Sequence, residues 1–364
     1  MTPRQKQVVG FVAFAAFVVV VALLPAFISA FRAQQFAFVG IYLIALLGLN
    51  ILTGYTGQIS LGHGAFMAVG GYTTALLMVG NEQFGQEGAL AIGGGMKDVW
   101  TIPIAGLVAG LVGLGFGIPA LRLSGLYLAL ATFAVAVATP SAAKRFQEFT
   151  GGGSGINLFG VPELTAGLTP VEIFGRELAF NDWLYYLCWT VALVLFAGAW
   201  LILRGRTGRA FRAVRDSETA AVSSGVSLAR YKILAFGISA AYAGVAGSLF
   251  TIAITFVNPD TFPIALSIFL LVGVVVGGLG QLGGLVFGAI FIHFMQIEWA
   301  QQMDAVVPDF LPIIGEIDTD TPGAPALAFG AVLILLMFFL PNGVGGIFRR
   351  AGQALTSWRY SRGA

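Results

Sequence analysis

The chain has 364 residues, of which 57% are hydrophobic and only 10% are charged. Soluble domains usually have a charged fraction of about a quarter, so this composition excludes an ordinary soluble protein. The formal net charge of +2 gives no indication of a nucleic-acid partner, and the single cysteine, Cys188, excludes an internal disulfide and a cysteine-based metal site.

Ten apolar runs predict an all-α polytopic membrane protein. They cover residues 8–31, 36–53, 65–80, 99–119, 123–143, 183–203, 233–257, 264–280, 284–297 and 325–340. Several approach the roughly 20 residues that a spanning helix needs. The runs 65–80 and 284–297 are shorter, so we expect them to be broken, tilted or re-entrant. The first run is longer than a normal signal core, so we expect an uncleaved helix there.

The distribution of charge between the loops predicts the orientation. If the N-terminus lies inside and the runs alternate, inner loops and tails contain 14 of the 19 Lys and Arg residues. Only two of the 17 acidic residues, Asp216 and Glu218, then lie inside. Cytoplasmic loops of membrane proteins are enriched in Lys and Arg, so both termini are predicted to be cytoplasmic.

The stretch 50–64 interrupts two apolar runs with four glycines and a set of polar side chains. Irregular backbone at membrane depth persists only where protein or a water-filled cavity satisfies its polar groups. The stretch therefore indicates a broken helix that lines a translocation path, although a simple cytoplasmic turn is the alternative. Its candidate path residues are Asn50, Thr53, Gln58, Ser60 and His63.

A second interruption, residues 277–284, adds Gln281 as a candidate path residue. Its Gly280-Gln281-Leu282-Gly283 faintly echoes Gly57-Gln58 and Leu61-Gly62. Paired interruptions in two halves of a transporter indicate a binding or gating region between structural repeats, so an internal repeat is possible.

The segment 204–232 holds seven basic residues between two apolar runs. We expect a helix over 210–224 that ends at Gly225, since glycine commonly follows a helix C-terminus. Ser227 is a candidate N-cap of the next helix. This pattern favours a cytoplasmic docking element for a soluble partner, and the alternative is a solvated loop that only sets topology. Its candidate docking residues are Arg209, Arg212, Asp216, Glu218, Ala220, Ala221 and Gly225.

The remaining features of the sequence are less informative about function. The glycine-rich 150–155 has no following Gly-Lys-Ser or Gly-Lys-Thr, so we expect no ATP hydrolysis by this chain. The acidic loop 298–324 is interpreted as solvated, with a docking surface for an external protein as the alternative. His63 and His293 are expected to be structural, and no metal site is predicted.

Three classes of protein are compatible with such a chain. An ion-coupled secondary transporter normally has acidic residues within its spans, and none is predicted here. A membrane enzyme needs a catalytic cluster, and no paired carboxylates or nucleophile–base arrangement is evident. A permease subunit needs only helices, a gated path and a docking site for an ATPase, so this class is favoured.

Six segments carry a resemblance to a known family. They are 48–63, 119–129, 150–156, 208–216, 232–236 and 277–281. With these residues the chain closely resembles the second permease subunit of branched-chain amino acid ABC importers, in a family that also includes urea and amide permeases. The resemblance implies a permease domain over 36–348, preceded by a tail and first helix over 1–35 and followed by a cytoplasmic tail over 349–364.

The same resemblance implies partners and a location. It implies a second homologous permease, two cytoplasmic ATPases that bind ATP and Mg²⁺, and an external solute-binding protein, with no cofactor in this chain. It places the protein in the bacterial cytoplasmic membrane, in contact with lipid. It also implies that 216–225 is the coupling segment held by an ATPase. The solute is expected to be a branched-chain amino acid, with urea or a short amide as the alternative.

Overall fold

The computed structural model describes residues 17–79, 94–123, 125–165, 171–173 and 176–294, with five single positions beyond them. The tenth predicted run, the acidic loop 298–324 and the tail 349–364 lie outside the described residues apart from those single positions. The helices are η1 (Leu24–Ala26), α2 (Ala30–Asn50), η2 (Ile51–Tyr55), α3 (His63–Met78), α4 (Asp98–Ala120), α5 (Leu126–Arg145), α6 (Gln147–Thr150), α7 (Phe180–Arg204), α8 (Arg206–Asp216), α9 (Glu218–Ser223), α10 (Leu228–Ile254), η4 (Pro259–Thr261), α11 (Ile264–Gly277) and α12 (Leu285–Phe294).

The described residues are predominantly helical, and six of their helices are long and apolar enough to cross a membrane. These are Ala30–Tyr55, Asp98–Ala120, Leu126–Arg145, Phe180–Arg204, Leu228–Ile254 and Pro259–Gly277. The two runs predicted to be short form the 16-residue α3 and the 10-residue α12. This is the architecture of a multi-pass membrane protein.

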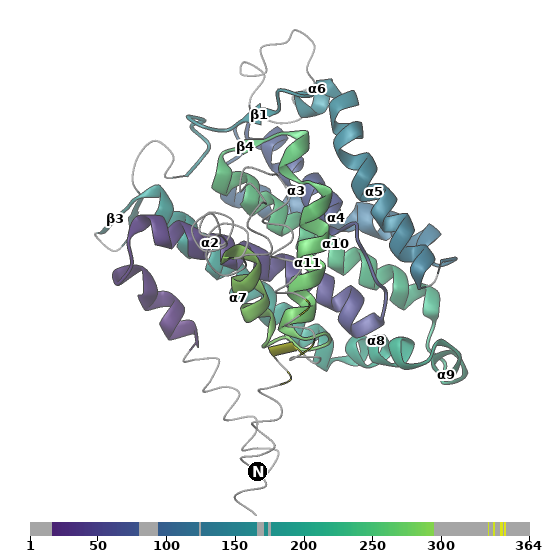
Figure 1. Ribbon diagram of the computed structural model, residues 1–364. Helices are drawn as coiled ribbons and strands as arrows, with labels where there is room; N and C mark the ends of the chain where they lie inside the picture. Colours follow the sequence, from purple (N-terminus) through teal and green to yellow (C-terminus); the bar gives the residue numbers. More distant parts are fainter. Residues whose placement is uncertain are drawn as a thin grey trace, which may run out of the picture.

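Helix α10 forms the centre of the bundle and packs against α4, α3 and α2 (Figure 1). Small residues allow the close approach. A Cβ at Gly70 would clash with the backbone of Gly244, and one at Gly247 would clash with the carbonyl of Met67. Glycine at such positions lets membrane helices approach backbone to backbone, which accounts for part of the glycine excess.

Two short sheets, which were not predicted from the sequence, accompany the helices. Strand β1 (Ile156–Asn157) pairs antiparallel with β4 (Phe256–Val257), and β2 (Val171–Ile173) pairs with β3 (Arg176–Leu178). They lie in connections between helices, where tertiary pairing satisfies the backbone groups that a loop would otherwise expose to solvent. The helical class of the molecule is unchanged.

Loops predicted to lie on one side of the membrane contact each other. At one end, β1 pairs with β4 and the Lys144 ammonium lies 3.1 Å from the Asp260 carboxylate. At the other end lie α8 and α9, and Figure 1 shows them far from α6, β1 and β4. We call the first the outer end, because its loops are predicted to lie outside the cell. We call the second the basic end, because it contains the basic central segment.

Candidate functional site

The central segment is an ordered structure of two helices at the basic end. The Phe211 side chain of α8 is fully buried and its ring packs edge-on against Tyr231 of α10, with ring centroids 6.2 Å apart. Val214, on the same face of α8, is also buried. This apolar face anchors α8 on the bundle, while Arg209 is exposed and Arg212 is half-buried.

The single helix predicted over 210–224 is wrong, because two helices occupy this stretch. The chain is extended at Ser217, with φ −165° and ψ 118°, and the Ser217 hydroxyl accepts a hydrogen bond from the Ala220 N–H at 3.3 Å. Serine is a strong N-cap residue, so it ends α8 and starts α9.

The predicted helix stop at Gly225 is confirmed. Gly225 has φ +81°, its N–H donates to the Val222 carbonyl, and the Val226 N–H donates to the Ala221 carbonyl. This pair of bonds is the Schellman arrangement, which needs a left-handed residue and favours glycine. Ser227 is the N-cap of α10 by position, without a side-chain capping bond.

Most of α9 is exposed, and an ion pair connects it to α10. Glu218, Ala220 and Gly225 are exposed, whereas Ala221 is buried. The Glu218 carboxylate lies 2.7 Å from the ammonium of Lys232, whose side chain is only 8% exposed. A displacement of α9 would therefore reach the first turns of the central helix α10.

The first interruption is a broken helix inside the bundle. Helix α2 continues through the π-helical turn η2, and the chain then leaves the helix at Gly57, which has φ +72°. The Leu61 N–H donates to the Thr132 hydroxyl of α5, and the Gly64 N–H donates to Ser267 of α11, both at 2.9 Å. The segment after Gly57 thus passes between helices before α3 begins, which favours the broken helix over a simple turn.

The polar side chains of this break are buried. Each of the five candidate path residues in the break is at most 9% exposed. The Thr53 hydroxyl donates to the Gln58 carbonyl at 3.1 Å, and the Gln58 amide donates to the Thr56 hydroxyl at 3.0 Å. Ser60 accepts from the Gly62 N–H at 3.4 Å, and His63 is buried at the start of α3, beside Gly48. Thr53 and Ser60 therefore satisfy part of the irregular backbone of the break.

The two interruptions lie against each other. The Asn50 amide oxygen accepts from the Gly280 N–H at 2.9 Å, and its nitrogen donates to the Gln281 carbonyl at 3.2 Å. Asn50 thus links the first break to Gly280 and Gln281, which lie 230 and 231 residues further along the chain. The two breaks are therefore neighbours in the fold, and the internal repeat stays a prediction.

Arg215 is a residue of this region that the sequence reasoning did not single out. Its Nη1 donates to the Gly54 carbonyl at 3.0 Å, while Nε and Nη2 lie 3.1 Å from the Asp216 carboxylate. The signal for it was weak but present. A basic residue in the last turn of a helix predicted to be cytoplasmic could have been expected to meet a helix predicted to end on the same side of the membrane.

A small polar pocket of about 120 Å³ lies between the break and the central segment. The break contributes Thr56, Gly57 and Gln58, and the central segment contributes Arg215, Glu218 and Lys232 among others. The pocket therefore lies between the candidate docking element and the candidate path.

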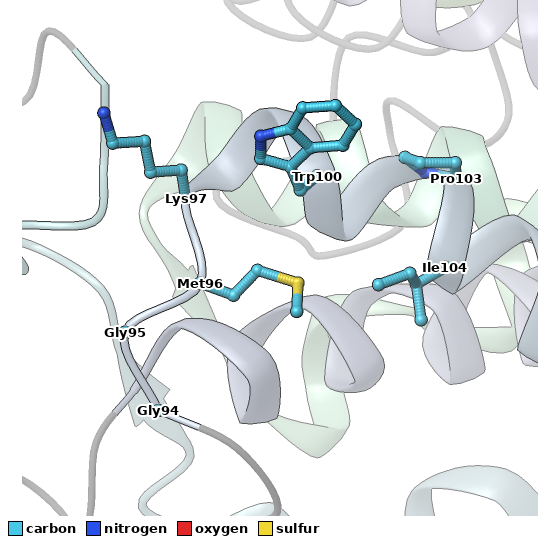
Figure 2. A pocket seen from close by; sticks show the side chains of 7 residues that line it. All are labelled: Gly94, Gly95, Met96, Lys97, Trp100, Pro103 and Ile104. Atoms are coloured by element: carbon cyan, nitrogen blue, oxygen red, sulfur yellow. The ribbon is translucent and has the colours of Figure 1, made fainter.

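A larger open groove of about 610 Å³ lies at the outer end, beside the start of α4 (Figure 2). Its lining includes Lys97, Trp100 and Pro103, and Trp100 is 67% exposed. Exposed Trp beside Lys is typical of helix ends at the membrane–water interface. We therefore interpret this groove as a surface at that interface.

The described residues contain no group of three His, Cys, Asp or Glu that could hold a metal ion. The His293 ring stacks on Phe38 with centroids 5.7 Å apart and lies in an aromatic cluster with Tyr42. This geometry gives His293 a packing role.

A multi-pass helical bundle with an interrupted helix and a basic, ordered central segment is the architecture expected of a membrane permease. The profile of the family described as "Branched-chain amino acid transport system / permease component" matches residues 31–341. The chain belongs to this family.

Curated relatives agree with the family. A high-affinity branched-chain amino acid transport system permease protein LivM from Escherichia coli (strain K12) is 34% identical over 84% of this chain and 67% of its own length. The LivM protein of Salmonella typhimurium is 33% identical over 86% of this chain and 71% of its own. A probable LivM of Methanocaldococcus jannaschii is 22% identical over 84% of this chain and 90% of its own. No solved structure was found to match the chain.

Proposed function

We propose that this chain is the membrane-spanning subunit of an ATP-binding-cassette importer that carries branched-chain amino acids across the bacterial cytoplasmic membrane. The observation that carries the proposal is the similarity, over 84% of the chain, to a permease named for branched-chain amino acid transport. Urea or a short amide is the alternative solute within the same architecture.

The proposed assembly has separate power and recognition subunits. It contains a second homologous permease, two cytoplasmic ATPases that bind ATP and Mg²⁺, and an external solute-binding protein. This chain itself contributes no cofactor site. In its membrane, ten elements alternate with both termini in the cytoplasm, which places the basic end on the ATPase side.

The docking surface in this proposal is α9 with the solvent-facing side of α8. The exposed residues Glu218 and Ala220 of α9, with Gly225 just beyond its end, would face the ATPase, beside Arg209 and Arg212 of α8. Buried Ala221 and the capping Ser217 hold the helix in shape, because one packs inward and the other satisfies an N-terminal N–H. Asp216 would act indirectly, by orienting the Arg215 guanidinium.

The solute path in this proposal runs beside the two interruptions. Asn50, Thr53, Gln58, Ser60, His63 and Gln281 are the proposed path residues, and the breaks would serve as hinges that open it. Among the described residues, Asp98 is the one buried carboxylate, and Thr165 of the outer end hydrogen-bonds it. The proposed path residues include no Asp, Glu, Lys or Arg, which suits a solute that is neutral overall, including a zwitterionic amino acid.

Transport by the reconstituted assembly tests the proposal. The complete complex in proteoliposomes should accumulate leucine, isoleucine and valine only with ATP and the binding protein present. Replacing Glu218 and Arg212 together with alanine should abolish uptake while the subunit still inserts in the membrane. The matched control, Arg230→Ala, removes an exposed cation from the first turn of α10 and should leave uptake intact.

Each half of the proposal has its own contrary result. Uptake of urea but not of leucine would contradict the amino-acid assignment and leave the architecture in place. Full uptake by the Glu218 and Arg212 double variant would contradict the docking role of the central segment. Accumulation by the purified subunit alone would contradict dependence on an ATPase.

A further inference from the structure

Arg215 contacts both sides of the junction between the central segment and the first break. Its guanidinium donates to the Gly54 carbonyl of η2 at 3.0 Å and pairs with Asp216 of its own helix. A Cβ built on Gly280, in the second break, would lie 3.2 Å from its Nη1 atom. One side chain thus bonds the first break and its own helix, and its guanidinium lies next to the second break.

The Gly54 carbonyl needs such a partner because the helix ends just beyond it. The Gln58 N–H, which would serve Gly54 in a continuing α-helix, donates instead to the Leu52 carbonyl at 3.1 Å. The last carbonyls of a helix have no intrahelical donors and carry the negative end of the helix dipole. A guanidinium satisfies both the hydrogen-bonding and the electrostatic demand.

Glycines in the two breaks leave the space that allows the Arg215 side chain to lie close to them. A Cβ at Gly57 would lie 3.0 Å from the Cγ atom of Arg215, and Gly57 and Gly280 both have φ +72°. At Gly54, a Cβ would clash with the Asn50 amide that binds Gly280. The backbone conformation and the lack of space both disfavour larger residues at these positions.

The surroundings of Arg215 leave room for movement. The polar pocket of about 120 Å³ lies beside its side chain, and the ion pair between Glu218 and Lys232 forms another wall. The break can therefore shift against the central segment without emptying or overfilling a packed core.

We propose that Arg215 is a positioning residue that transmits the displacement of α8 and α9 to both helix breaks. The inference rests on the proposed function, in which an ATPase moves α9. Asp216 fixes the direction of the guanidinium, the Gly54 carbonyl receives the displacement, and Asn50 passes it to the second break. Arg215 itself contacts neither the solute nor the ATPase in this scheme.

The test compares three variants of the complete importer in proteoliposomes. Arg215→Ala removes the link, and Arg215→Lys keeps the charge with a donor for Gly54 but loses the fork that also holds Asp216. Arg206→Ala is the matched control, since it removes an exposed cation from the same helix. Each variant is first checked for monodisperse elution with the partner subunits bound.

The readout is solute transported per ATP hydrolysed. For Arg215→Ala we expect ATP hydrolysis to continue while this ratio falls by about tenfold, within the ~5–150-fold range of coupling between sites. The lysine variant should recover part of the loss, and the Arg206 variant should match the unmodified importer. An unchanged ratio in Arg215→Ala would overturn the proposal, and so would loss of ATPase binding, which would make Arg215 a docking residue.

A distance measurement separates transmission from a merely structural role. Spin labels at Ser224→Cys, beyond α9, and Leu279→Cys, in the second break, are both at exposed positions. ATP binding should leave this distance nearly constant in the unmodified chain, because the two parts move together, and should change it in Arg215→Ala. Equal behaviour of the two would overturn the proposal. An unmodified importer without ATP-driven uptake would instead contradict the proposed function itself.

Discussion

Asn50 illustrates how single polar side chains hold this bundle together. Its amide satisfies one N–H and one carbonyl of the second break, and Gly54 lies against it with no space for a side chain. Backbone groups left unpaired inside a membrane cost several kcal/mol, so a single amide that serves two of them contributes far more than a surface bond.

At Gly54 we therefore predict that alanine destabilises the protein. Its Cβ would clash with the Asn50 amide and lie 2.5 Å from the Gly280 nitrogen, so the contact between the breaks must open. We expect a loss of about 1–3 kcal/mol, typical of overpacking, seen as a lower midpoint of thermal unfolding in detergent. Gly283→Ala is the control, because nothing lies within 4 Å of its added Cβ. Equal midpoints would contradict the close packing described.

Asp98 gives a second prediction at the residue scale. Its carboxylate accepts from the Val99 N–H at 2.8 Å and from the backbone N–H and hydroxyl of Thr165, and it is fully buried. Asparagine would place an N–H₂ donor against at least one of these donors, so we expect Asp98→Asn to cost about 1–3 kcal/mol.

The comparison for Asp98 is the exposed acid Asp260, whose pair with Lys144 is largely solvated. Asp260→Asn should change the unfolding midpoint little, since exposed ion pairs contribute about 0–1 kcal/mol. A larger effect at Asp260 than at Asp98 would show that the outer end is held by its surface charges instead of the buried carboxylate.

At the scale of the elements, the contact between α4 and α10 depends on which face of α4 carries glycine. A Cβ at Gly113 would clash with Ala240 and lie 3.0 Å from the Phe236 carbonyl. Gly115, two residues further on, has nothing within 4 Å of an added Cβ and is exposed. Only the first position faces the central helix.

We predict that Gly113→Leu prevents correct packing of α4 on α10, whereas Gly115→Leu is tolerated because it adds an apolar side chain to an exposed apolar face. The yield of monodisperse protein in detergent should fall strongly for the first variant and stay near normal for the second. The reverse ranking would place the wrong face of α4 against α10.

The element scale also shows where prediction from the sequence ends. The run 99–119 anticipates α4 within a residue, because hydrophobicity along a spanning helix is a local property. The split between α8 and α9 was missed, although Ser217 is a good N-cap. The alanines near it have a high helix propensity, so the sequence favours one continuous helix. The bond from Arg215 to Gly54 joins residues 161 apart in sequence, and no local pattern encodes such a contact.

For the molecule as a whole, the topology predicted from the runs and loop charges was more informative than the overall composition. Alternation of the predicted runs puts the central segment and both interruptions on the same side of the membrane, and the structure brings Arg215, Gly54 and Gly280 together at one end. The buried carboxylate of Asp98 was not anticipated, because burial at a helix start depends on the loop that folds over it.

The central claim is that the segment containing α8 and α9 faces the cytoplasm, where an ATPase can reach it. A membrane-impermeant thiol reagent applied to Ser224→Cys in sealed vesicles tests this directly, because Ser224 is exposed and the native Cys188 is buried. Ser154→Cys, exposed at the outer end, is the matched control. The account predicts that Ser224→Cys is labelled in inside-out vesicles and protected in right-side-out vesicles, with Ser154→Cys showing the opposite. Labelling of Ser224→Cys from the outside would contradict it.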